Sequence, residues 1–167
     1  MKGCRPLQPQ EIKQLLGKLN PRDKLLCLTG LYFGTRISET LQLKFRDVSE
    51  EYINIKSQKN SENVTFTIGP EYKKAVKELQ SYYKTCGIDI TPDMYLFLSR
   101  EGQNMPIHRS QASRIIKKTC KALGLEGKIN SHSFRKNFVT AIYEKSGFNI
   151  AETKKYSRHK SLSNLDY

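Results

Sequence analysis

Hydrophobic positions in this chain mostly recur three or four residues apart, the spacing that lines one face of an α-helix. One section differs, because apolar and polar side chains alternate on both sides of the polar stretch 57–63. Alternation with period two around a polar turn predicts a β-hairpin. The predicted strands are 52–55 and 64–68, and the predicted helices are 9–19, 21–33, 37–43, 70–86, 110–123, 133–146 and 149–156. This pattern predicts a mainly α-helical fold with one small antiparallel β-hairpin, an α+β class.

The helix at 21–33 is expected to lie at the centre of the fold. Asn20 is a favourable N-cap, Pro21 needs no amide partner in the first turn, and Asp23 complements the helix dipole. Apolar residues then dominate until the pattern breaks at Gly34-Thr35. No repeat or linker divides the 167 residues, so we expect a single domain.

Charge narrows the range of partners. Lys and Arg number 29 against 16 acidic residues, a net charge of +13 with a pI of about 9.6. Such an excess favours a polyanion, with nucleic acid before a membrane surface. The longest apolar stretches are far shorter than the roughly 20 residues of a spanning helix, and the N-terminus lacks a signal-peptide pattern. We therefore expect a cytoplasmic protein that does not bind membranes.

Cysteines and histidines give little support for a metal centre. The four cysteines occur singly, without the paired spacing of a zinc knuckle or a disulfide framework. No Asp or Glu accompanies His132 or His159 at ligand spacing, and Arg135, Arg158 and Lys160 would repel a dication. We expect neither a metal nor another cofactor.

Five basic residues stand out, although each has an ordinary structural explanation. Arg36 lies at the break between two apolar helices, where it either satisfies helix-end carbonyls or points into a cleft. His132 and Arg135 are three residues apart and would share a helix face. Lys59 alone is typical of a solvated hairpin lysine, and His159 alone is typical of a capping or core histidine.

Their order and spacing connect them. The segment 29–44, TGLYFGTRISETLQLK, resembles the first signature box of the tyrosine recombinases, the phage-integrase family. SHSFR at 131–135, with RHKS at 158–161 and Tyr167, resembles the second box. QKN at 58–60 falls where the family carries a catalytic lysine in a hairpin turn. The resemblance covers nearly the whole chain and implies the fold of this family's catalytic domain.

The resemblance also implies a reaction, the cutting and rejoining of DNA through a 3′-phosphotyrosine without metal. Tyr167 would be the nucleophile, His132 its base and Lys59 the general acid for the leaving 5′-oxygen. A phenol has a pKa near 10, so forming the phenolate at neutral pH costs about 4 kcal/mol. A base or nearby positive charge must offset that cost.

The phosphate-binding groups implied by the resemblance are Arg36, Arg135 and His159. Guanidinium groups match the non-bridging oxygens of a phosphate in a bidentate manner and stay charged. His159 would donate a further hydrogen bond to the same group. Ser38 and Glu39, beside Arg36, are expected to position it rather than to take part in the chemistry.

Two departures from the family pattern leave alternatives open. The family usually has Leu-Gly-His where this chain has Ser157-Arg158-His159. Tyr167 lies eight residues after His159, one fewer than the family spacing. One residue on a helix turns a side chain by about 100°. Either the local helix adjusts and Tyr167 attacks, or the nucleophile lies beyond residue 167 and Tyr167 caps the core.

The resemblance further implies which partners to expect. Full-length members carry an N-terminal DNA-binding clamp domain and a C-terminal tail, which are expected to be absent from residues 1–167, a single catalytic domain. The partner would be double-stranded DNA, bound mainly through phosphates. The helix 110–123 would contact the DNA backbone or form a solvated face. Its basic residues are Arg114, Lys117, Lys118 and Lys121.

The leading hypothesis is therefore a site-specific recombinase or integrase domain, acting on nucleoid DNA of a prokaryote or its virus. The family assembles as tetramers on DNA, whereas the isolated domain is expected to be monomeric. Three alternatives remain open. They are a non-cleaving DNA-binding module of the same fold, a type IB topoisomerase-like relaxing activity, and an unrelated basic helical DNA-binding protein.

Overall fold

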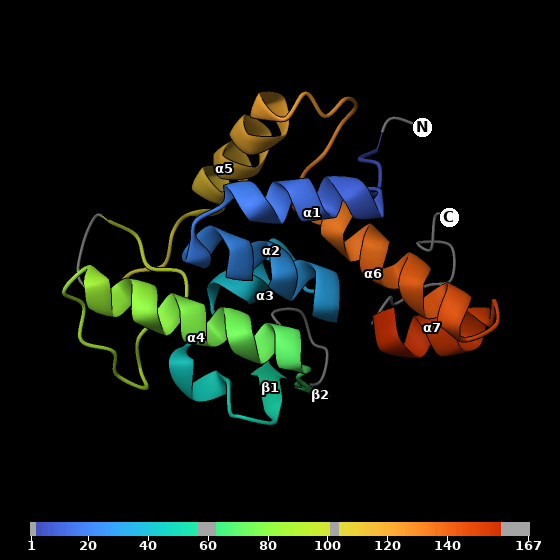
Figure 1. The fold of residues 1–167 in the computed structure, drawn as a ribbon. Coiled ribbons are helices and arrows are strands. Elements are labelled where there is room, and N and C mark those ends of the chain that lie inside the picture. Colours follow the sequence, from blue (N-terminus) through green and yellow to red (C-terminus); the bar gives the residue numbers. More distant parts are fainter. Residues whose placement is uncertain (1–2, 57–62, 101–103, 158–167) are drawn as a thin grey trace.

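The apolar helix α2 (Pro21–Phe33) lies at the centre of the fold, packed against α4 (Pro70–Thr85) and α6 (Ser131–Lys145) (Figure 1). The computed structural model describes residues 3–56, 63–100 and 104–157. The other elements in these ranges are α1 (Pro9–Lys18), α3 (Ile37–Leu41), the 3-10 turn η1 (Phe45–Asp47), β1 (Tyr52–Ile55), β2 (Val64–Thr67), α5 (Arg109–Ala122) and α7 (Ile150–Ser157). The fold is mainly helical with one two-stranded antiparallel sheet, so the predicted fold class is confirmed. None of the helices within the described ranges has the length and apolarity to cross a membrane.

Local sequence signals set both ends of α2. Asn20 Oδ1 accepts a hydrogen bond from the Asp23 amide at 2.9 Å, which satisfies one of the unpaired amides of the first turn. At the other end Gly34 adopts a left-handed φ of 57°, a conformation that glycine reaches without a steric penalty. The start and the break predicted from the sequence are both confirmed.

Two predicted boundaries are wrong because tertiary contacts and caps prevail over periodicity. The helix predicted at 37–43 ends at Leu41, since the Leu43 carbonyl instead accepts the Leu96 amide at 2.9 Å. The helix predicted from 133 begins at Ser131, because the Asn130 side chain accepts the His132 amide at 2.9 Å. His132 therefore lies inside α6, in its first turn.

The predicted β-hairpin is confirmed in its strands. β1 and β2 pair antiparallel, with Tyr52 opposite Thr67 and Ile55 opposite Val64. Ile53 and Ile55 are fully buried, whereas Tyr52, the first residue of β1, is exposed. One face of the hairpin thus covers the core, as alternation requires. The connection between the strands at 57–62 lies outside the described residues.

α6 approaches α2 unusually closely at two glycines. A β-carbon at Gly30 would lie 3.0 Å from Phe134 Cβ, and one at Gly34 would lie 2.2 Å from Phe138 Cδ1. The two glycines are four residues apart, and so are the two phenylalanines, so the two aromatic rings cover the same stripe of α2. This approach brings the first turns of α6 to the end of α2.

The chain enters the domain through an N-terminal strap, residues 4–8. The Arg5 amide donates to Lys128 O at 3.0 Å, and Arg5 Nε donates to Glu126 O at 2.8 Å. The Arg5 guanidinium also grips the carboxylate of Glu11 on α1 in a bidentate pair, at 2.7 and 2.6 Å. The strap is thereby tied both to α1 and to the loop that precedes α6.

Replacing Gly34 by alanine is expected to destabilise the fold. Alanine at φ 57° is strained, and its β-carbon would overlap the Phe138 ring. The free energy of unfolding should fall by about 2 to 4 kcal/mol. Gly17→Ala is the control, because Gly17 lies in α1 and no heavy atom lies within 4 Å of where its β-carbon would be. It should stabilise by about 0.5–1 kcal/mol. Urea unfolding of both variants tests this, and equal effects would contradict the packing described.

The Arg5–Glu11 pair is expected to make stability depend on pH. Hydrogen bonds from the Arg5 guanidinium and the Gln8 amide lower the pKa of Glu11 to about 2. An unfolded glutamate titrates near 4.3, so this contribution is complete above about pH 4.3 and is lost as pH falls toward 2. Because the two side chains are 34% and 20% exposed, we expect about 1 kcal/mol.

Urea unfolding of wild type and Glu11→Gln at several pH values measures this contribution. The variant should be less stable at pH 7, and the difference should shrink below about pH 4 as the wild-type carboxylate becomes protonated. A difference that stays the same down to pH 2.5 would contradict a role for the Glu11 charge.

Candidate active site

The turn between α2 and α3 presents Arg36 at the surface. Thr35 is buried immediately before it, with its hydroxyl 2.6 Å from that of Thr40. The Thr40 hydroxyl also lies 3.2 Å from the Arg36 carbonyl. These contacts hold the backbone on both sides of the turn, so the position of Arg36 is fixed even though its side chain is 35% exposed.

The side chain of Glu39 holds Arg36 in place. Its two carboxylate oxygens accept hydrogen bonds from the Arg36 amide at 2.9 Å and from Arg36 Nη1 at 3.0 Å. The glutamate side chain is 1% exposed, so the acid is buried while the guanidinium it holds faces solvent. The prediction that Glu39 positions Arg36 is confirmed by these two bonds.

Arg135 reaches the same turn from α6. It is 7% exposed, and its Nη1 donates a hydrogen bond to the carbonyl of Gly34. Consecutive Cα atoms are about 3.8 Å apart, so Gly34 and Arg36 are separated by at most about 7.6 Å. Arg135, distant in sequence, is therefore bonded to the turn at the end of α2 that carries Arg36. Arg135, rather than Arg36, bonds the helix-end carbonyl.

This grouping has the electrostatics of an anion site. Two guanidinium groups and one carboxylate leave an excess of one positive charge, and arginine stays protonated in proteins. The amides of the first turn of α6 add the positive end of a helix dipole. A phosphate group, whose negative charge is shared by its non-bridging oxygens, suits such donors.

His132 lies one helical turn before Arg135 on α6, so the two residues share a face of the helix as predicted. The imidazole is exposed, and the backbone amide is satisfied by Asn130. His108, by contrast, has a structural role, because its Nδ1 accepts a hydrogen bond from the Ser110 amide at 3.3 Å and so caps α5. Lys59, His159 and Tyr167 lie outside the described residues.

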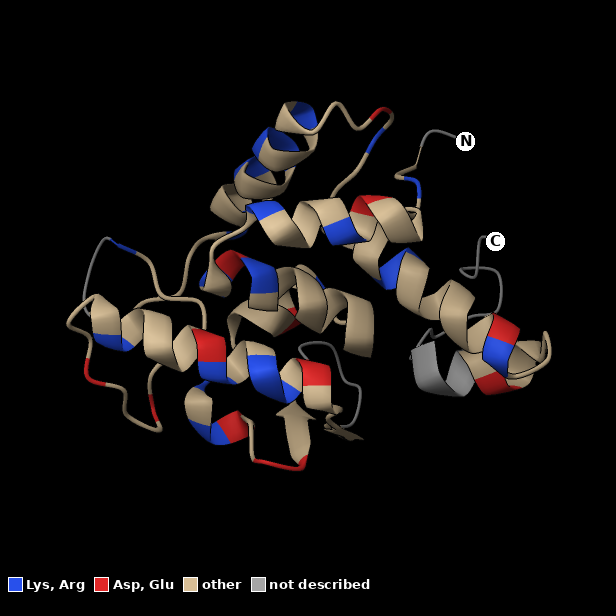
Figure 2. Cartoon of the chain, in the orientation of Figure 1, with Lys and Arg blue, Asp and Glu red and all other residues tan. Residues whose placement is uncertain are grey.

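A basic face runs along α5. Its residues 114, 117, 118 and 121 are all exposed lysines or arginines, whereas Ala112, Ile116 and Cys120 on the other side are buried (Figure 2). α5 packs against α1 and α3, and α3 is the helix that Arg36 begins. The predicted basic helix therefore borders the arginine turn.

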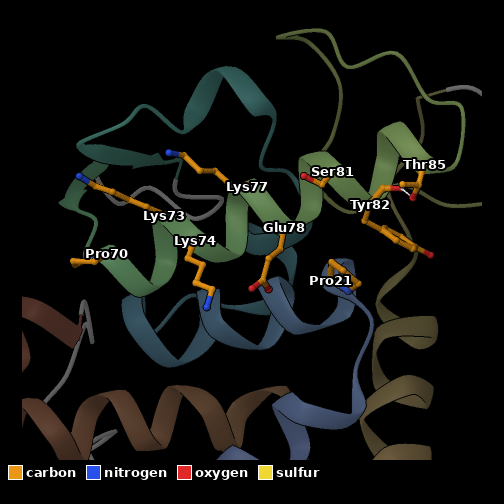
Figure 3. A pocket seen from close by; sticks show the side chains of 9 residues that line it. All are labelled: Pro21, Pro70, Lys73, Lys74, Lys77, Glu78, Ser81, Tyr82 and Thr85. Atoms are coloured by element: carbon orange, nitrogen blue, oxygen red, sulfur yellow. Dashed lines mark hydrogen bonds between the residues drawn. The ribbon is translucent and has the colours of Figure 1, made fainter.

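A second basic surface on α4 was not predicted. Lys73, Lys74 and Lys77 line a shallow hollow of about 730 Å³, shown in Figure 3. Lys74 and Glu78 point toward α2, where Glu78 pairs with Lys24 at 2.8 Å. The helical spacing of these lysines was a signal that the sequence offered. Among the described residues no three His, Cys, Asp or Glu side chains form a cluster suited to a metal ion.

A comparison with known protein families agrees with the fold. A model of the phage integrase family matches residues 5–167. The chain belongs to the phage integrase family. A tyrosine recombinase of Pseudothermotoga lettingae is 33% identical over 162 residues, covering 94% of this chain and 53% of that protein. The probable integrase/recombinase YoeC of Bacillus subtilis is 33% identical over 155 residues, covering 92% of this chain and 80% of YoeC.

Solved structures share the fold of this phage integrase family member. XerA recombinase superposes with a TM-score of 0.79 at 24% identity, over 98% of this chain and 58% of that one. XerH bound to its difH substrate superposes with a TM-score of 0.76 at 20% identity, over 97% and 49%. The chain thus spans about half the length of these two proteins and of the Pseudothermotoga relative.

Proposed function

We propose that this chain is the catalytic domain of a site-specific DNA recombinase that cuts and rejoins DNA through a 3′-phosphotyrosine, without a metal ion. The observation that carries the proposal is the bond from Arg135 to the turn that carries Arg36, in a member of the phage integrase family. Two arginines over one buried carboxylate suit the non-bridging oxygens of a scissile phosphate.

In the proposed reaction the Tyr167 oxygen bonds to phosphorus while the bond from phosphorus to the 5′-oxygen breaks. The phenolic proton passes to His132, and Lys59 gives a proton to the leaving 5′-oxygen. Arg36, Arg135 and His159 hold the phosphate and stabilise the charge that develops on it. Rejoining is the same step in reverse, with a DNA 5′-hydroxyl as the attacking group.

The proposal extends to partners. Exchange between two duplexes requires more than one active site, so we infer self-association on DNA. We infer a cytoplasmic location, because the DNA of a prokaryote lies there. We also infer that residues 1–167 act as one catalytic domain, consistent with a match that spans residues 5–167. XerH was solved with a DNA substrate, and we extend duplex DNA binding to this chain.

A duplex nicked close to the cleavage site tests the chemistry, because loss of a short fragment traps the covalent adduct. We expect an adduct that survives a denaturing gel, resists EDTA, and is abolished by Tyr167→Phe. Arg135→Ala should slow its formation by about 100- to 1,000-fold.

Tyr52→Phe is the matched control for the loss of a tyrosine hydroxyl, because Tyr52 is exposed on β1, and it should react at the wild-type rate. An adduct that persists in Tyr167→Phe would move the nucleophile to another residue. DNA binding without any wild-type adduct would favour the non-cleaving module, and relaxation of plasmids of any sequence would favour the topoisomerase-like activity.

We further propose that the basic face of α5 contacts the DNA backbone, because α5 packs against the helix that Arg36 begins. Replacing Lys117, Lys118 and Lys121 together by Gln should weaken binding. The slope of log affinity against log salt should become shallower by about 2 to 3, since each phosphate contact contributes about 0.9.

The lysines of the α4 hollow provide a charge-matched control for this experiment. Replacing Lys73, Lys74 and Lys77 by Gln removes the same charge from a helix that packs against α2 instead. This variant should leave the salt slope unchanged. Equal changes in the two triple variants would mean that net charge, rather than contact by α5, governs binding.

A further inference from the structure

The side chain of Asn137 joins the N-terminal strap to α6. Its Oδ1 accepts a hydrogen bond from the Leu7 amide at 2.9 Å, and its Nδ2 donates to the Leu7 carbonyl at 2.6 Å. The side-chain amide thus pairs with both polar groups of one residue, as a neighbouring strand would.

Leu7 makes this pairing costly to lose. Its side chain is 3% exposed and belongs to the main hydrophobic core. Buried backbone polar groups need partners, and removing one partner leaves the other unsatisfied. On either side of Leu7, the strap is anchored by the Arg5 bonds to Glu126 O and Lys128 O and by α1. The strap is therefore a fixed support rather than a loose end.

Asn137 holds α6 on the side away from the arginine turn. Residues two apart on an α-helix point about 200° apart, so Asn137 and Arg135 lie on nearly opposite sides. Arg135 bonds Gly34 on one side, and the stripe of Phe134 and Phe138, which packs on the glycines of α2, lies between Arg135 and Asn137. On the other side Asn137 bonds the strap. α6 is clamped between the two.

Such a clamp controls rotation of the helix about its axis. Side chains reach about 5–6 Å from a helix axis, so a rotation of about 10° moves their tips by about 1 Å. A misplacement of about 1 Å can lower a reaction rate about 100-fold. Loss of the bonds to Leu7 could therefore affect the chemistry, although these bonds are remote from the phosphate, because a small rotation of α6 is enough.

We propose that Asn137 is a positioning residue: by pairing with Leu7 it sets the rotation of α6 and so the placement of Arg135 at the reacting phosphate. This inference rests on the proposed function. It makes the strap a part of the support of the active site, and it assigns to residues 4–8 a role that no motif in the sequence indicates.

The test compares Asn137→Ala with Asn20→Ala in the full chain. Asn20 has a similar pair of bonds, accepting from the Asp23 amide and donating to its carboxylate, both at 2.9 Å. It lies at the far end of α2, about 20 Å from Gly34 at 1.5 Å per residue. The measurements are the single-turnover rate of adduct formation on the nicked duplex, the DNA affinity and the thermal midpoint.

We expect Asn137→Ala to slow adduct formation about 10- to 100-fold with less than a twofold change in DNA affinity. Asn20→Ala should lower the thermal midpoint by a similar amount yet change the rate less than twofold. If Asn137→Ala lowers the rate of adduct formation by displacing Arg135, this effect must be smaller in a chain that lacks Arg135. In the Arg135→Ala background, Asn137→Ala should therefore cost less than threefold.

Equal rates for the two asparagine variants would overturn the inference. So would the same loss in both Arg135 backgrounds, because a merely structural effect is additive. A wild-type chain that forms no adduct defeats the proposed function, and hydrogen exchange then decides the structural part alone. Asn137→Ala must speed exchange of the α6 amides more than Asn20→Ala does, and no such difference would overturn it.

Discussion

The packing of α6 on the end of α2 is the contact on which the rest of the structure depends. A β-carbon at residue 34 would lie 2.2 Å from the Phe138 ring, so the two helices approach because that position is glycine. The same glycine takes the left-handed φ that ends α2 and turns the chain toward Arg36. Its carbonyl accepts the bond from Arg135. Gly34 thus ends α2, leaves room for the Phe138 ring and accepts the hydrogen bond from Arg135.

This arrangement holds positive charge where the fold by itself gains little from it. Burial of Arg135 removes part of the hydration of its guanidinium group. The buried carboxylate of Glu39 and the Gly34 carbonyl offset part of that cost. In the proposed function, a bound phosphate would offset the remainder.

The support around this site is spread over the whole chain. The strap holds α6 through Asn137, Glu39 holds Arg36, and α5 packs on the helix that follows the arginine turn. The strap bond and the α5 packing join segments that are far apart in sequence, whereas Glu39 holds Arg36 from three residues away. The α4 lysines show that positive charge occurs elsewhere as well, so the placement of charge distinguishes the candidate site, not its amount.

The sequence alone determined the elements and the local contacts of the turn that carries Arg36. Period, caps and breaks act within a few residues, so α2, the hairpin strands and the turn before Arg36 followed directly from Asn20, the alternation and Gly34. Glu39 could be assigned to Arg36 because they are three residues apart. Tertiary structure decided the rest. It shortened α3 at Leu41, brought Arg135 to a carbonyl 101 residues away, and paired Asn137 with Leu7 across 130 residues. Such bonds leave no periodic trace, because they form when packed helices bring the partners together.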